Sequence, residues 1–128
     1  MRETIKTLGA PEAIGPYVQA NVLDKLIFTS GQIPIDPATG EFVSGGIEEQ
    51  TEQCLKNVAA ILKAADSGLG NVLKTTVFLS DINNFASMNA VYARCFDGIC
   101  LPARSAVQVA ALPKGALVEI EVIAYRPA

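Results

Sequence analysis

The stretch "LPARSAVQVAALPKGALVEIEVIAY" (residues 101–125) holds two apolar segments of strand character that are joined by a Pro-Lys-Gly turn. The first segment contains Arg104, and the second contains Glu119 and Glu121. Burying an unpaired charge in a protein interior is costly, so these ions must be exposed, paired with each other, or used in binding or catalysis.

The alternation of side chains along a strand assigns these charges to faces of the expected sheet. In the strand expected at 117–126, one face is uniformly apolar, which predicts that it lies under the helices: Val118, Ile120, Val122 and Ala124. The opposite face is mixed: Leu117, Glu119, Glu121, Ile123 and Tyr125. By symmetry, in the strand expected at 103–110, we place Val107 and Val109 under the helices and Arg104 on the face of the glutamates.

The mixed face is more apolar than a strand face in contact with water needs to be. A face of this kind usually docks onto another surface, and a closed homo-oligomer is the expected partner. The ions would then lie in a partly desolvated cleft between subunits. The pattern leaves a second interpretation open, in which Arg104 forms a structural cross-strand salt bridge with Glu119 or Glu121.

The rest of the chain completes the prediction of the fold. Short strands are expected at 16–22 and 25–33 as a hairpin, followed by a helix at 47–66, a strand at 71–81 and a helix within 82–96. The order ββ-α-β-α-ββ predicts a single α+β domain over residues 1–128. We expect one mixed β-sheet with two helices packed on one face.

Composition restricts the classes of function. Half of the 128 residues are hydrophobic, but no window of about 18 residues is uniformly apolar, which argues against a membrane span. The N-terminal residues lack the apolar core of a signal peptide, so a cytoplasmic protein is expected. The net charge is −3 and no lysine–arginine cluster occurs, which argues against nucleic-acid binding.

The inventory of reactive side chains is equally restrictive. The chain has no histidine, and its three cysteines form no CxxC pair, so no metal site is expected. Cys54 and Cys95 fall on the apolar faces of the expected helices and are interpreted as small hydrophobic residues. Chemistry would therefore depend on Arg, Glu, Tyr, Ser, Asn and backbone groups.

Four long segments resemble the RidA/YjgF family of enamine/imine deaminases, and together they cover nearly the whole chain. They are "APEAIGPYVQA" (10–20), "FTSGQIPIDPATGE" (28–41), "LKTTVFLSDINNFASMNAVY" (73–92) and "PARSAVQVAALPKGALVEIEVIA" (102–124). The resemblance implies a chorismate-mutase-like fold and a homotrimer with sites at the subunit interfaces. It also implies hydrolysis of 2-iminopropanoate and 2-iminobutanoate, which arise from enamines such as 2-aminoacrylate, to 2-oxo acids and ammonia. No cofactor is implied.

The resemblance assigns roles to two residues as catalytic. Arg104, in "PARS", matches the residue that anchors the carboxylate of the substrate, a task that suits the planar fork of arginine. Glu119, the first acid of "EIE", matches the carboxylate that positions the attacking water. Glu121 is expected to lie deeper in the trimer contact without a catalytic role.

Five further positions are substrate-binding candidates by resemblance. Tyr17 would line the pocket or serve as an interface aromatic residue. Gly31, after Ser30, would offer its backbone N–H to the carboxylate. Asn89 would contact the substrate or hold a neighbouring group. Ala106 stands where family members commonly have cysteine, and its backbone N–H would keep the contact while the thiol is lost.

Two other functions remain open from the sequence. The first is a non-catalytic trimer that binds small 2-oxo or 2-imino acids as a sensor, which Arg104 would serve equally well. The other is an endoribonuclease or translation inhibitor, which ranks a distant third after the deaminase and the sensor. The acidic composition and the absence of histidine both count against it.

Overall fold

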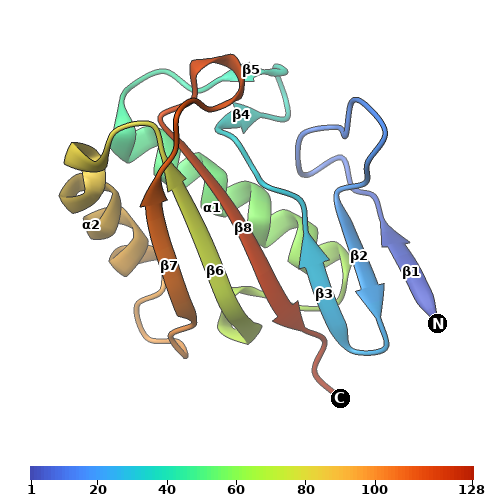
Figure 1. The fold of residues 1–128 in the computed structure, drawn as a ribbon. Coiled ribbons are helices and arrows are strands. Elements are labelled where there is room, and N and C mark those ends of the chain that lie inside the picture. The colour runs from blue at the N-terminus through green and yellow to red at the C-terminus, as the bar shows by residue number, and fades with distance from the viewer.

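The computed structural model describes residues 1–128. Two helices and eight strands follow one another along the chain (Figure 1): β1 (Arg2–Ile5), β2 (Ala20–Leu23), β3 (Leu26–Thr29), β4 (Ile35–Asp36), β5 (Glu41–Phe42), α1 (Ile47–Ala64), β6 (Val72–Leu79), α2 (Phe85–Cys95), β7 (Ala103–Gln108) and β8 (Val118–Tyr125). Short 3₁₀ turns precede β6, α2 and β8.

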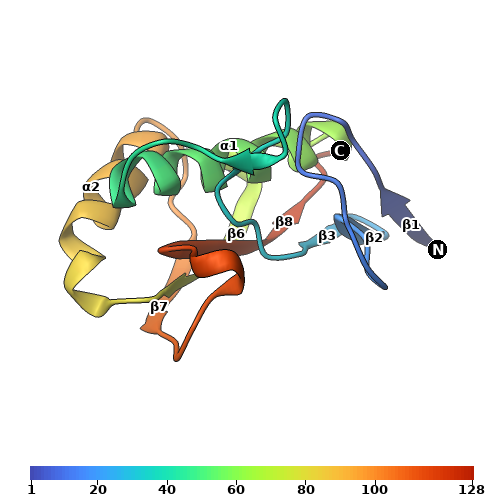
Figure 2. The same ribbon diagram turned by 90° about the horizontal axis from the view of Figure 1, so that it is seen from above.

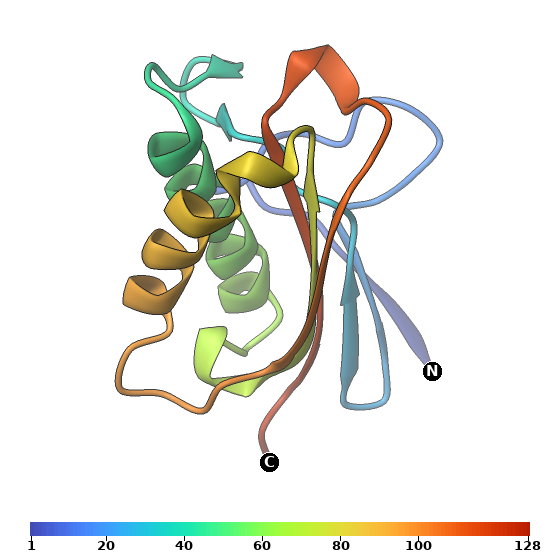
Figure 3. The same ribbon diagram turned by 60° about the vertical axis from the view of Figure 1, so that its left-hand side comes forward.

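One six-stranded sheet organises the molecule, with the strand order β1-β2-β3-β8-β6-β7. All neighbours pair antiparallel except β6 and β7, which are parallel and are connected through α2. Both helices cover the same face of this sheet, and the opposite face is left open (Figures 2 and 3). The prediction of a mixed sheet with two helices on one face is confirmed.

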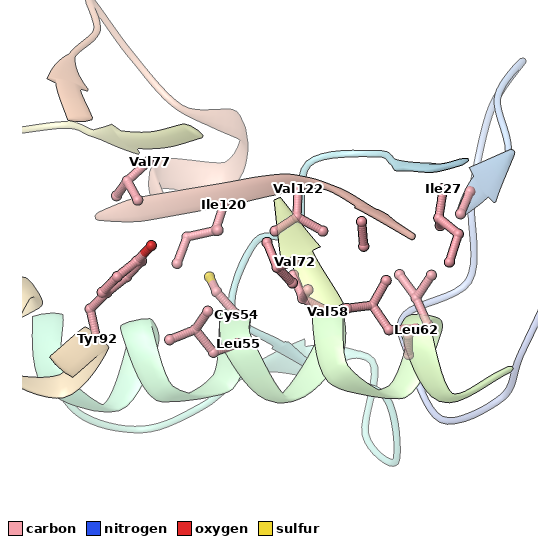
Figure 4. Packing of buried hydrophobic residues seen from close by; sticks show 14 of the residues in the cluster. Ile27, Cys54, Leu55, Val58, Leu62, Val72, Val77, Tyr92, Ile120 and Val122 are labelled. Atoms are coloured by element: carbon pink, nitrogen blue, oxygen red, sulfur yellow. The ribbon is translucent and has the colours of Figure 1, made fainter. Parts of the chain in front are cut away.

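The core lies between the helices and the sheet, and Figure 4 shows its packing. The helix-facing residues of β8 are buried as predicted: Val118, Ile120 and Ala124 have no exposed surface, and Val122 is 3% exposed. Apolar residues of α1 at helical spacing oppose them: Cys54, Leu55, Val58, Ile61 and Leu62. Burial of this apolar stripe stabilises α1, whose first turn also places Glu48 and Glu49 near the positive end of the helix dipole.

The prediction for β7 is wrong in its choice of face. Neighbours in register point to the same face of a sheet. Arg104 lies opposite Thr75, and Thr75 is buried under the helices. Val107 lies opposite Phe78 on the open face and is 46% exposed. Arg104 therefore lies on the helix side of the sheet, and Val107 faces away from the helices.

Several short elements were not predicted. β1 pairs with β2 at one edge of the sheet, and β4 and β5 form a separate two-stranded hairpin. The predicted hairpin exists, but β2 and β3 are only four residues each. Neither helix has the length and apolar character that crossing a membrane requires.

The cysteines differ in their surroundings. Cys54 has no exposed surface, and its thiol donates to the carbonyl oxygen of Val118 at 3.6 Å. Burial raises the pKa of the Cys54 thiol, as does the nearby Glu119 carboxylate, so the thiolate is strongly disfavoured. The interpretation of Cys54 as a core residue is confirmed, whereas Cys95 is only half-buried and Cys100 is exposed.

Candidate active site

Arg104 projects from the edge strand β7 toward α2. Its guanidinium donates to Oδ1 of Asn89 at 2.6 Å. The same group lies over two aromatic rings of α2, 4.7 Å from the centroid of Tyr92 and 5.4 Å from that of Phe85. Arg104 is exposed and takes part in none of the salt bridges of the chain. An oriented guanidinium without a carboxylate partner is suited to receive one from a ligand.

The sequence predicted Asn89 but not the two rings. Phe85, Asn89 and Tyr92 are spaced i, i+4 and i+7 along α2, so they form one stripe of the helix. From the sequence alone, Phe85 and Tyr92 fit the apolar spacing of a helix that packs on the core. The polar Asn89 interrupts this aromatic stripe, and that is a sequence signal for a cationic side chain packed against the stripe.

The free edge of β7 adds backbone donors beside Arg104. The N–H of Val109 donates to the carbonyl of Leu79 at 2.9 Å, so alternate residues of β7 face β6. By the same alternation, the N–H groups of Arg104 and Ala106 point away from β6 toward the open edge. The backbone N–H of Ala106 therefore has no partner in the sheet and faces the open edge.

Glu119 lies on the open face of β8, next to Gly31. A Cβ built at Gly31 would lie 2.8 Å from Cδ of Glu119 and closer still to its Oε2. Only glycine leaves room for the carboxylate in this position. Gly31 and Glu119 lie close together because their chain neighbours, Gln32 and Ile120, pair through two backbone hydrogen bonds.

The pKa of the Glu119 carboxyl is raised, first by burial and second by the charge of Glu121. A raised pKa means that the folded chain binds this proton more tightly than the unfolded chain does. Ionisation of Glu119 therefore lowers the stability as the pH rises from the ordinary value of 4.5 through the raised pKa of the folded state.

We expect Glu119→Gln to raise the unfolding midpoint at neutral pH, by a few degrees at most, because it removes a half-buried charge. The gain should shrink as the pH falls below the ordinary pKa of 4.5, where Glu119 is neutral in both states. Thermal unfolding of both proteins between acidic and neutral pH measures this. A gain that is independent of pH would contradict the raised pKa.

Ser30 directly precedes Gly31, and Tyr17 lies in the loop that leads into β2. The hydroxyl of Ser30 donates to the carbonyl of Val18 at 2.6 Å, and its N–H donates to Gln19 at 2.9 Å. Tyr17 is 52% exposed and lines a shallow groove together with Ser30 and Phe28. The hydroxyl proton of Ser30 is thus engaged in holding the segment that carries Tyr17.

Gln19 is a supporting residue that the sequence did not reveal. Its side chain is 4% exposed and makes four hydrogen bonds to the backbone of the preceding loop: it accepts from Thr7 N–H and donates to the carbonyls of Thr7, Ala10 and Pro11. These bonds fix the loop that leads into Tyr17.

Gln19→Leu should therefore destabilise the chain by about 2–3 kcal/mol, because several backbone groups lose their partner. Denaturant unfolding measures the change. Gln53→Leu is the matched control, since Gln53 makes a single side-chain bond, to Asn57, and should cost less than about 1 kcal/mol. Equal costs for the two variants would refute the assigned role.

The candidate residues form two separate groups. Arg104, Asn89 and Ala106 lie at the β7 edge on the helix side, whereas Glu119 and Gly31 lie on the open face. In register, Glu119 is level with Phe78 and Arg104 with Thr75, and β6 separates the two strands. Their Cα atoms are therefore roughly 14 Å apart, and their side chains point to opposite faces.

This separation excludes the cross-strand salt bridge that the sequence left open. Arg104 contacts neither Glu119 nor Glu121 as an ion pair in the chain. A single chain accordingly holds two half-sites, each incomplete. The described residues include no cluster of His, Cys, Asp or Glu that could hold a metal ion.

Comparison with known proteins identifies the family. The family model described as endoribonuclease L-PSP matches residues 7–126. The 2-iminobutanoate/2-iminopropanoate deaminase of Mus musculus is 52% identical over 126 residues, which cover 98% of this chain and 93% of that protein. The chain belongs to the RidA/YjgF family.

Solved structures of RidA/YjgF proteins match the fold closely. The crystal structure of a conserved Rid family protein from Yersinia pestis has a TM-score of 0.95 and 51% identity, covering 98% of this chain and 99% of that one. TdcF of E. coli, crystallised with bound serine, has a TM-score of 0.94 and 48% identity, with coverage of 98% and 99%. The chorismate-mutase-like fold implied by the resemblance is that of this family.

Proposed function

We propose that this protein hydrolyses 2-iminopropanoate and 2-iminobutanoate to the corresponding 2-oxo acids and ammonia, in sites formed between the subunits of a cytoplasmic homotrimer. Relatives named 2-iminobutanoate/2-iminopropanoate deaminase support imine deamination as the general activity. The observation that carries the proposal is the guanidinium of Arg104, which is exposed, oriented by Asn89 and free of any carboxylate partner.

Arg104 anchors the carboxylate of the imino acid through two parallel hydrogen bonds. The backbone N–H of Ala106, at the same free edge, donates to the carboxylate as well. The serine bound to E. coli TdcF also carries an α-carboxylate, which agrees with a receptor of this type. These contacts hold the C=N carbon at a fixed distance from the strand edge.

Glu119 activates the water. The substrate reacts as its iminium: the carboxylate takes a proton from water while the oxygen attacks the iminium carbon, and the electrons of the C=N bond move to nitrogen to give a neutral carbinolamine. Glu119 then returns the proton to the nitrogen and the C–N bond breaks to release ammonia. The hydroxyl oxygen gives its proton to the carboxylate, and from there to water, as the carbonyl forms. The raised pKa of Glu119 favours this exchange, because the carboxylate is a stronger base than an ordinary surface glutamate. The iminium is already electrophilic, so the reaction uses neither a metal nor a cofactor.

The two half-sites require a second copy of the chain. Within one chain, Arg104 and Glu119 face opposite sides of the sheet, so one substrate can contact both only where the β7 edge of one subunit meets the open face of another. The open face is apolar enough for such docking, with Leu26, Phe28, Val107 and Tyr125 each between 37% and 46% exposed. Closed cyclic symmetry repeats the contact around the oligomer, and we propose three sites per trimer.

In this arrangement Tyr17, Ser30 and Gly31 contribute from the subunit that supplies Glu119. The N–H of Gly31 makes no hydrogen bond within the chain and is free to donate to the substrate. Asn89 acts through Arg104. We expect no nucleic-acid or membrane partner.

A second candidate function is a trimeric binder of 2-oxo or 2-imino acids that does no chemistry. Arg104 and Ala106 would serve it unchanged, so only the role of Glu119 separates the two proposals. The raised pKa of Glu119 and the space that Gly31 leaves for its carboxylate favour the enzyme.

The test is the release of pyruvate and 2-oxobutanoate from imines generated in situ by a serine/threonine dehydratase. Wild type should accelerate release above spontaneous hydrolysis, and Glu119→Gln should lose the acceleration while still binding 2-oxobutanoate. Glu121→Gln is the matched control, since it removes a carboxylate from the same face and should keep most of the activity, because burial, the larger cause of the raised pKa of Glu119, is unchanged. If wild type binds 2-oxobutanoate but does not accelerate imine hydrolysis, the proposal of an enzyme is wrong and the non-catalytic binder takes its place.

A further inference from the structure

Three residues of α2 contact the side chain of Arg104. Arg104 contacts Tyr92 at 4.7 Å, Phe85 at 5.4 Å and Asn89 at 2.6 Å. Three successive positions of one helical stripe thus converge on a single exposed side chain. A cation over the face of an aromatic ring at such distances is attracted by the ring.

Tyr92 is itself fixed from the sheet. Its hydroxyl and Oγ1 of Thr75 lie 2.7 Å apart in a hydrogen bond, and both residues are buried. Its ring also packs on Phe96, with centroids 4.6 Å apart. Figure 4 shows Tyr92 reaching from α2 toward the sheet. A buried hydroxyl is costly to leave without a partner, so this bond holds the ring in place.

Thr75, Tyr92 and Arg104 are connected to one another in a closed set of contacts. Thr75, the partner of the Tyr92 hydroxyl, is also the residue of β6 that lies in register with Arg104 on β7. The sheet therefore fixes Tyr92 at the level where the arginine leaves its strand, and the ring of Tyr92 then meets the guanidinium. An exposed arginine without such contacts samples many rotamers. Binding of a carboxylate then fixes one rotamer, and the lost conformational entropy weakens the binding.

We infer that Tyr92, supported by Thr75 and joined by Phe85, is a positioning residue that holds the guanidinium of Arg104 in its carboxylate-binding orientation. This inference rests on the proposed function, because the ligand whose affinity it raises is the carboxylate of the 2-imino or 2-oxo acid. Tyr92 is only 6% exposed and contacts Arg104, so we expect it to act on the ligand through Arg104 and to affect binding more than the chemical step.

The test measures the dissociation constant of 2-oxobutanoate by calorimetry, together with imine hydrolysis. Tyr92→Leu should raise the dissociation constant roughly 3- to 30-fold, with a smaller effect on kcat, because it removes the ring contact. Tyr92→Phe keeps the ring but loses the bond to Thr75, so it should raise the dissociation constant less than Tyr92→Leu does, by at most about threefold. Phe85→Leu, at a half-buried position that endangers folding less, should raise the constant in the same direction but less.

A double-mutant cycle separates positioning from general destabilisation. In an Arg104→Lys background the side chain cannot stack in the same way, so Tyr92→Leu should have a much smaller further effect than in wild type. Ile61→Ala, which empties core volume on α1, is the control for lost stability and should leave the dissociation constant unchanged in the folded protein.

The outcomes are distinguishable. If wild type binds 2-oxobutanoate and the dissociation constant is the same in Tyr92→Leu and Phe85→Leu, the inference about Tyr92 is wrong but the proposed function stands. An equal effect of Tyr92→Leu with and without Arg104→Lys would overturn it as well. Absence of both binding and hydrolysis in wild type would overturn the proposed function and the inference with it.

Discussion

Arg104→Ala is expected to lower imine hydrolysis by at least about a hundredfold, because two charge-assisted hydrogen bonds to the carboxylate are lost together. The guanidinium has no ion-pair partner in the chain, so its removal leaves no buried charge unpaired. The stability of the chain should therefore change little. Steady-state hydrolysis and light scattering measure activity and assembly on the same sample.

Arg104→Lys is the matched control for charge. Lysine keeps the positive charge but loses the planar fork and the stacking on Tyr92, so it should recover only part of the activity. Dissociation of Arg104→Ala into monomers, with activity lost in proportion, would contradict the assignment of Arg104 to the substrate. It would place the residue in the subunit contact instead.

Gly31→Ala is expected to reduce activity by roughly ten- to a hundredfold without a comparable loss of stability. The new Cβ would occupy the space of the Glu119 carboxylate, 2.8 Å from its Cδ, and the flexible side chain would move aside. The backbone of Gly31 is not in the left-handed region, so alanine is tolerated conformationally. A shift of the general base by about 1 Å is enough for a loss of this size.

Gly68→Ala is the control for the loss of a glycine. No atom lies within 4 Å of a Cβ built at Gly68, and its φ of −172° is ordinary extended backbone. Its activity should equal that of wild type. Full activity in Gly31→Ala would show that hydrolysis does not depend on the observed position of Glu119.

The sequence predicted the parts of the fold that bury one continuous apolar face. In β8, alternation between Val118, Ile120 and the two glutamates was unambiguous, and the structure confirms both faces. β1 could not be predicted in the same way, because only Ile5 of its four residues is buried. The polar residues of such a short edge strand carry no periodic signal.

The face of Arg104 could not be read from local alternation. No residue of β7 is fully buried, so neither of its faces shows an apolar signature. Its orientation follows from its parallel register with β6, which depends on how α2 carries the chain back to the sheet. That error mattered for function, because the correct face removes the salt bridge and separates Arg104 from Glu119.

The roles of Tyr92 and Gln19 were hidden for a different reason. Tyr92 fits the apolar spacing of α2, and the one sequence signal of its contact with a cation is indirect: the polar Asn89 interrupts the aromatic stripe. Gln19 bonds to a loop that begins twelve residues earlier, at Thr7. Contacts of this kind depend on the tertiary fold and have no local sequence signal.

We propose that one active site takes Arg104 from one subunit and Glu119 from another. To test this, Arg104→Ala and Glu119→Gln chains are co-expressed, and imine hydrolysis by the mixed oligomers is measured. In a closed ring assembled at random from equal amounts, about a quarter of the contacts unite an intact Arg104 with an intact Glu119. We predict recovery to about a quarter of the wild-type rate, far above either variant alone. Activity no greater than the average of the two separate variants would contradict the claim.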